Sequence, residues 1–299
     1  MWQLFVLGSL LAYAFEGVID KLALVEDRRI DSLVATFWRV ICFSLATFCL
    51  GLTGWLGHVQ GLFPPILLPL VLMAVVSSLS YTYVLRRLEV TGIGAIGYLA
   101  PFAFLFIDVQ GLQLHFSLAQ IAGITLLVLG GIGFIVDGTT HRIKKEFSLL
   151  VWGALLFQSI FSGIEAYVFK SLHVTQGITG VTFFLDIWMA GGLVLLLIII
   201  MRGKFRLLLT TPAGVYVPPI MLSKVFDALG TALWTQALVL AAVSQVAAME
   251  SLEPIVLFGV AFVAQIFFGY RVRERFSRTH LHFKLVAVCL LVLGGFLVG

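Results

Sequence analysis

The hydrophobic positions of this chain form long unbroken runs instead of alternating or mixed patterns. Each run of about 20 apolar residues is long enough to cross the hydrocarbon core of a bilayer as a helix. No run shows the alternation over about ten residues that is typical of a membrane β-strand. The pattern therefore predicts an all-α integral membrane protein. Ten spans are expected, at about 2–24, 33–56, 65–85, 91–109, 117–136, 148–170, 179–201, 216–240, 244–268 and 283–298.

Composition agrees with this class and excludes several others. Of the 299 residues, 61% are hydrophobic and 11% are charged, which is too little charge for a soluble surface. The connections between runs are short and leave no room for a soluble domain. The three cysteines lie in apolar runs without disulfide or zinc spacing, and no phosphate loop or nucleophile elbow is found. No cofactor, no metal and no enzymatic activity are expected.

The basic residues predict how the chain is oriented. The net charge is +4, and most of the 19 lysine and arginine residues lie in the short loops after odd-numbered spans. Such loops face the cytoplasm under the positive-inside rule. A multi-pass protein of the plasma (inner) membrane is therefore expected, with both termini outside. Because the basic residues act as orientation signals, no nucleic-acid partner is expected.

An internal repeat divides the expected spans into two halves. Matching segments are Leu7–Leu11 with Trp152–Leu156, Leu99–Phe102 with Leu252–Ile255, and Leu127–Gly131 with Leu291–Gly295. Residues 1–138 and 147–299 are therefore read as two five-helix units. Since five is odd, the second unit enters the membrane from the opposite side. Such inverted repeats are typical of secondary transporters with a site near the midplane.

Charged residues inside the spans are the candidates for function. They are Glu16, Asp20, Arg39, Glu165, Asp186, Lys224, Asp227, Glu250 and Glu253. Seven carboxylates facing lipid would cost on the order of 20 kcal/mol. That exceeds the stability of a typical domain, roughly 5–15 kcal/mol. Most of these groups must therefore face the bundle interior, pair with a base or carry a proton.

Depth along each span, at about 1.5 Å per residue, sorts these charges into two expected clusters. The cluster next to the odd loops holds Asp20, Arg39, Glu250 and Glu253; the other holds Glu165, Asp186, Lys224 and Asp227; Glu16 lies near the midplane. The hypothesis is that the clusters are two gates around a central site. Asp20 and Glu165 occupy equivalent places in the repeat and would exchange environments, which is a way to carry a proton.

Each candidate has a structural alternative. Arg39 with a nearby acid, and Lys224 with Asp227, are equally well explained as structural ion pairs. Tyr98 and Trp234 could stack on a substrate, although a lone aromatic in a span more often serves packing. Lys21, near the end of its span, is expected to extend to the headgroups.

The segments Ser251-Leu252-Glu253-Pro254-Ile255, Leu99-Ala100-Pro101-Phe102 and Gln120-Ile121-Ala122-Gly123, with Leu129-Gly130-Gly131, carry a family resemblance. With the duplicated ten-span layout, the chain resembles the EamA-domain family of the drug/metabolite transporter superfamily. The resemblance implies a secondary transporter of small metabolites and supports a gating role for Glu253 and Glu250. Members usually have cytoplasmic termini, opposite to the charge count. Pro254 is expected to loosen the backbone near Glu250.

The functional expectation combines these observations. The excess of buried acids favours a substrate with an amine, such as an amino acid, moved by alternating access with proton coupling or exchange. Export of hydrophobic cations or drugs is one alternative. A non-transport role in assembly or lipid chemistry is another. The expected partners are a small-molecule substrate, protons and the lipid bilayer, and the oligomeric state stays open.

Overall fold

The computed structural model describes residues 1–25, 30–54, 67–88, 117–135, 148–211, 213–250, 252–268 and 278–298. Within these ranges the regular secondary structure is helical and no strand occurs. The helices are α1 (Trp2–Val25), α2 (Ser32–Leu52), α3 (Leu68–Leu85), α6 (Leu118–Ile135), α7 (Leu149–Gln176), α8 (Gly180–Met201), α9 (Phe205–Thr210), α10 (Ala213–Leu240), α11 (Val243–Glu250), α12 (Glu253–Phe268) and α13 (Arg278–Val298). The span expected at 91–109, with Tyr98, lies outside the described residues.

Length and composition make six of the described helical stretches able to cross a membrane. They are α1, α2, α3, α7, α8 and the stretch Val243–Ile266 formed by α11 and α12. This confirms the all-helical, multi-pass membrane class. Helix α10 has 28 residues but is not among the six, and it contains Lys224 and Asp227. Lys224 is buried within the bundle, while Leu222 and Val225 on the same helix are exposed.

Local sequence explains where several helices begin and end. The side chains of Asp31, Ser148 and Thr179 cap α2, α7 and α8 by accepting hydrogen bonds from the backbone N–H groups of the first turn. Such caps satisfy donors that have no partner within the helix. Helix α7 ends at Gly177, whose φ of 69° is the left-handed conformation that glycine adopts without strain.

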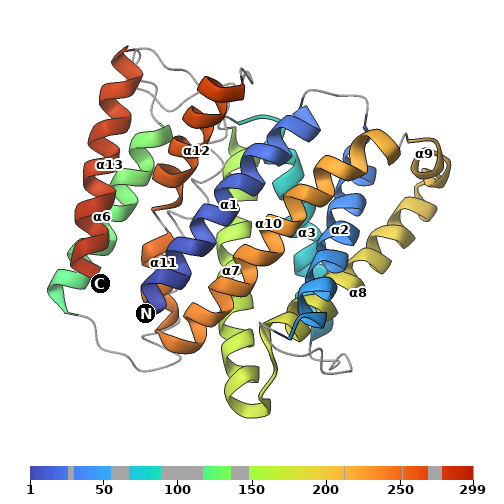
Figure 1. The fold of residues 1–299 in the computed structure, drawn as a ribbon, viewed down its shortest axis with the longest axis horizontal. Helices are drawn as coiled ribbons and strands as arrows, with labels where there is room; N and C mark the ends of the chain where they lie inside the picture. The colour runs from blue at the N-terminus through green and yellow to red at the C-terminus, as the bar shows by residue number, and fades with distance from the viewer. Residues whose placement is uncertain are drawn as a thin grey trace.

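Two helix pairs make the most extensive contacts, α1 with α10 and α6 with α13. Figure 1 shows α6 and α13 side by side at one edge of the molecule, while α1 and α10 cross its middle next to α7. Partners along α1 and α10 run in opposite directions, since Tyr13 contacts Thr231 and Asp20 contacts Ser223. The two helices are therefore antiparallel, which decides how their charged side chains meet.

The ninth expected span, 244–268, is found as a stretch of membrane-spanning length that is divided between α11 and α12. Helix α11 ends at Glu250 and α12 begins at Glu253, while the Leu252 N–H donates to the Met249 carbonyl oxygen at 3.0 Å. Pro254 is the second residue of α12, where its missing N–H would have had no helical partner in any case. The proline therefore fits the start of a new helix, and the two glutamates flank the break.

Candidate functional site

A cavity of about 290 Å³ lies in the middle of the bundle. Its lining comes from α1, α2, α3, α7, α8, α10, α11 and α12. Helices α6 and α13 contribute none of the described lining residues, consistent with their pairing at the edge of the molecule. Segments from both halves of the chain thus surround one internal space.

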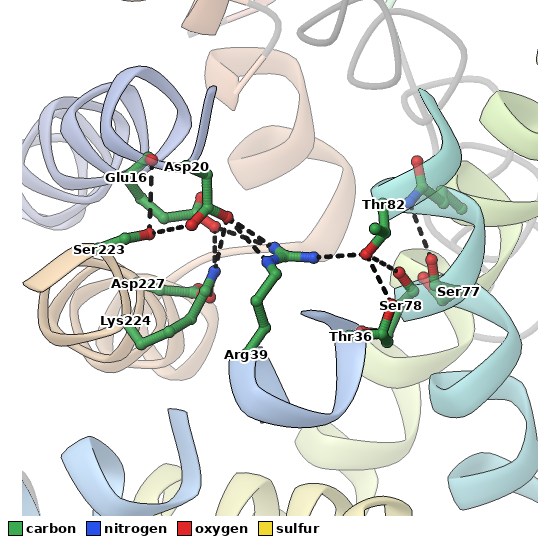
Figure 2. A network of polar contacts seen from close by, with 11 residues as sticks. Glu16, Asp20, Thr36, Arg39, Ser77, Ser78, Thr82, Ser223, Lys224 and Asp227 are labelled. Atoms are coloured by element: carbon green, nitrogen blue, oxygen red, sulfur yellow. Dashed lines mark hydrogen bonds and ion pairs between the residues drawn. The ribbon is translucent and has the colours of Figure 1, made fainter. Parts of the chain in front are cut away.

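Lys224 of α10 is the centre of a buried ion cluster on the cavity wall. Its Nζ forms ion pairs with Glu16, with Asp20 at 3.2 Å and with Asp227 at 2.8 Å. Figure 2 shows these carboxylates converging on the amine from α1 and from α10 itself. The Lys224 side chain is only 2% exposed, so its charge depends on these carboxylates for compensation.

Arg39 of α2 extends the cluster toward α3. Its Nε and Nη2 atoms both lie 2.9 Å from Asp20 Oδ2, and Nη2 lies 3.4 Å from Glu16 Oε1. Its Nη1 donates to Thr82 Oγ1 at 3.3 Å (Figure 2). The guanidinium carbon lies 4.3 Å from the centre of the Tyr81 ring, a cation–π contact. Arg39 therefore joins α1 to α3 through both charge and stacking.

Asp20 is the most enclosed acid of the cluster. Its side chain is fully buried, and besides the two bases it accepts a hydrogen bond of 2.6 Å from the Ser223 hydroxyl. Both oxygens of this carboxylate therefore have donors, Oδ2 the two bases and Oδ1 the Ser223 hydroxyl, which compensates for burial. The cluster of Glu16, Asp20, Arg39, Lys224 and Asp227 contains three acids and two bases.

The expected division into two charge clusters is wrong for Lys224 and Asp227. Both join Asp20 and Arg39 in one network instead of lying in the opposite membrane half. The expected spans 1 and 8 already run in opposite directions, so α10 begins on the side where α1 ends, and the first half of α10 lies at the height of Asp20. Lys224 lies in the first half of α10, so it meets Asp20 near the end of α1.

Glu165 of α7 lines the same cavity without an ion pair to the described bases of the cluster, and its charge is within electrostatic reach of Asp227. It is 7% exposed, and its Oε1 atom has no hydrogen-bond partner. Glu250 and Glu253 also line the cavity, from the two sides of the α11–α12 break, and are partly buried. Within the described part of the chain, no basic side chain pairs with these three acids. The cavity lining therefore combines a charge-paired cluster with three acids that have no base as a partner among the described residues.

Aromatic side chains complete the lining. Trp234 of α10 is buried and lines the cavity. Its ring packs edge-on against Phe184, with centroids 6.1 Å apart. Phe161 and Trp188 line the cavity as well. Trp234 thus lies at the cavity, as a stacking candidate should.

Two other sequence expectations turn out differently. Asp186 of α8 is half-buried and is absent from the cavity lining, so the structure does not bring it to the other acids. Lys21 does not extend to the headgroups. It is 5% exposed, and its Nζ donates to the carbonyl oxygens of Leu85 and Leu88. A charged amine there satisfies carbonyls that the end of α3 leaves open.

Sequence reasoning missed the polar face of α3. Ser77, Ser78 and Tyr81 line the cavity, and Thr82 binds Arg39. Their spacing of three and four residues is the signal that would have found them, because such residues share one helix face. Gln158 of α7 donates to the Ser77 carbonyl oxygen at 3.1 Å and so ties α7 to this face.

No family model and no curated protein matches the sequence. A solved structure described only as "Crystal structure of protein" is similar in fold, with a TM-score of 0.71 over 99% of this chain and 95% of its own. The two sequences are 12% identical. At this identity the likeness concerns the fold alone. Fold and site together define a helical, multi-pass membrane protein with a charged internal cavity.

Proposed function

We propose that the protein is a secondary transporter that moves a small amine-containing molecule across the membrane by alternating access. The observation that carries this proposal is the internal cavity, which eight helices line with five acids and two bases. These residues are Glu16, Arg39, Glu165, Lys224, Asp227, Glu250 and Glu253. Charges inside apolar helices are costly and mark substrate or ion pathways. An acidic excess attracts a cationic group.

The broken helix between α11 and α12 supports the same function. Transporters commonly place their sites at interrupted helices, where backbone groups are released from the helical pattern. We further propose ten spans in two inverted repeats and membership in the EamA-domain family, as the sequence resemblance implies. A plasma-membrane location with both termini outside follows from the positive-inside count.

Proton coupling or exchange is the proposed source of energy. A carboxylate that meets water in one state and is dry in the other can release and take up a proton. The cluster around Asp20 connects α1, α2 and α10, so separation of these helices would expose its charges. In this proposal the cluster closes one side of the cavity. The alternative is that the ion cluster only stabilises the fold and takes no part in opening or closing the cavity.

Export of hydrophobic cations is the second candidate. The aromatic lining from Phe161, Phe184, Trp188 and Trp234 favours it, because aromatic faces attract cations and contact apolar groups. Both candidates use the same cavity and differ in how polar the substrate is.

The test is uptake of radiolabelled amines and amino acids into proteoliposomes with an imposed pH gradient. We expect gradient-dependent flux of at least one amine, and its loss in Asp20→Asn and Glu165→Gln. Asp186→Asn, which removes an acid outside the cavity, serves as the control. Absence of gradient-dependent flux for every compound would favour the roles in assembly or lipid chemistry. Unchanged flux and pH dependence in both cavity variants would refute the coupling scheme.

A further inference from the structure

The two bases of the cavity are already occupied. The Lys224 Nζ donates hydrogen bonds to Glu16 and Asp227 and forms an ion pair with Asp20. Arg39 directs its donors to Asp20, Glu16 and Thr82, and one face of its guanidinium covers Tyr81. These contacts leave little capacity for another anion.

A substrate carboxylate would therefore have to displace a protein carboxylate from one of these bases. The displaced acid would lose its compensation in a buried or largely buried place: Asp20 is fully enclosed, Glu16 is nearly so, and the Asp227 side chain is 22% exposed. Leaving one member of a buried ion pair without its partner is strongly unfavourable. The ion cluster thus opposes any ligand that brings its own negative charge.

Glu165 offers the reverse situation. It is more than nine-tenths buried, one of its carboxylate oxygens has no hydrogen-bond partner, and it faces the cavity. It lies within α7, away from the helix N-terminus that could stabilise a negative charge. A buried carboxylate without a donor is costly, and an ammonium group would supply both charge and hydrogen bonds.

The surroundings of Glu165 suit the remainder of such a ligand. Phe161 precedes Glu165 by one helical turn on α7, and Phe184, Trp188 and Trp234 line the same cavity. Aromatic faces attract cations and bury apolar groups. The cavity volume of about 290 Å³ is at the small end of ligand sites, so one ring with a short amine chain is a suitable size.

We propose that this cavity binds organic amines that lack a carboxylate, with Glu165 as the acceptor of the ammonium group, and that it excludes the corresponding amino acids. The inference rests on the proposed transport function and narrows its substrate class. The excess of acids alone is compatible with both amines and amino acids as substrates, and this inference selects the amines. Glu165 is then the residue that decides specificity, and the ion cluster is the element that rejects zwitterions.

The experiment measures equilibrium binding by titration calorimetry with the full chain in lipid nanodiscs. Matched ligands are phenethylamine with phenylalanine and tryptamine with tryptophan, and 2-phenylethanol is the uncharged analogue. We expect each amine to bind at least tenfold more tightly than its amino acid or the alcohol. Equal or tighter binding of the amino acids, or no binding of either amine, would overturn the proposal.

Variants test the role of Glu165. Glu165→Gln should weaken amine binding at least tenfold and reduce the preference for amine over alcohol, whereas Asp186→Asn should leave both unchanged. Amine affinity in Glu165→Gln equal to that of the wild type would contradict the assignment. If Glu165→Gln does not fold, the comparison of the amines with their amino acids and with the alcohol on the wild-type protein still decides the substrate class.

The binding measurement tests the substrate class and the flux measurement tests transport, so the two proposals can fail independently. Binding that follows the expected pattern, without flux in proteoliposomes, would retain the site and refute transport. Gradient-driven flux of amino acids at the rate of their amines, or faster, would retain transport and refute the substrate class.

Discussion

Lys224 of α10 and Asp20 of α1 lie with Nζ and Oδ2 3.2 Å apart, although they come from opposite halves of the chain. This ion pair connects the contacts of Arg39 on one side with those of Asp227 on the other. Because it links α1 and α10, which pack extensively against each other, we expect it to affect the stability of the protein.

Removal of the amine should destabilise the protein strongly. Lys224→Met leaves Glu16, Asp20 and Asp227 with Arg39 as the nearest base of the cluster. Loss of one partner from a buried ion pair costs about 3–5 kcal/mol. We expect a decrease of this size in the free energy of unfolding, measured by SDS titration of the protein in mixed micelles.

The double variant Lys224→Met/Glu16→Gln is the control for that prediction. It removes an acid together with the base, so its stability should lie above that of Lys224→Met alone. Contacting residues show such non-additive effects. Strictly additive losses would mean that the two groups are not energetically coupled.

Arg39 should not be replaceable by lysine. Arg39→Lys keeps the positive charge but loses the planar group that bonds Asp20 and Thr82 while stacking on Tyr81. We expect a clear decrease in the thermal unfolding temperature. Arg87→Lys is the matched control, since Arg87 also stacks on a tyrosine, Tyr83 at 4.2 Å, but is exposed. Equal decreases in unfolding temperature for the two replacements would show that the contacts of Arg39 in the ion cluster add nothing to stability.

Gly294 should be essential for the packing of α13 against α6. A Cβ atom there would lie 2.7 Å from the Gly123 carbonyl oxygen and 2.9 Å from the Leu127 nitrogen, both of them backbone atoms that cannot rotate away. Gly294→Ala should therefore lower the unfolding temperature, as overpacking costs typically 1–3 kcal/mol. Gly153→Ala, with no atom within 4 Å of the new Cβ, should be neutral or slightly stabilising. A tolerated Gly294→Ala would show that the helix contact is looser than described.

Asp31, which lies outside the spans, makes a pH-dependent contribution to the free energy of unfolding. Burial alone would raise its pKa, but the 2.6 Å ion pair with Lys204 and the cap on Leu33 N–H outweigh burial and lower the pKa. The contribution is therefore present above the ordinary aspartate pKa, about 4, and is lost as the pH falls through the lowered folded-state value. Both side chains are partly exposed, so it stays below about 1 kcal/mol.

Asp31→Asn isolates this charge because asparagine still caps a helix. The stability difference between wild type and variant should shrink as the pH falls from about 5 to 3. The measurement is the thermal unfolding temperature at a series of pH values. A constant or growing difference would contradict the prediction.

The sequence predicted the helical elements well and the site in part. The described helices follow the expected spans closely, and Glu16, Glu165, Glu250 and Glu253 line the cavity. Asp186 does not reach the cavity, and the polar face of α3 was missed. Periodicity gives the face and height of a residue on its own helix, but not the neighbour toward which that face turns.

The sequence by itself determined the class of protein, since only a helix satisfies its own backbone hydrogen bonds in lipid and apolar run length sets its extent. It also determined which costly charges must be compensated inside the bundle. Only the tertiary structure decided the pairing: the contact between α1 and α10 brings Lys224 to Asp20, and the ninth span is divided between α11 and α12. Among the described residues, it also leaves Glu165 Oε1 without a hydrogen-bond partner. Which helices are neighbours, and how each is rotated, depends on contacts between distant segments, which no local pattern contains.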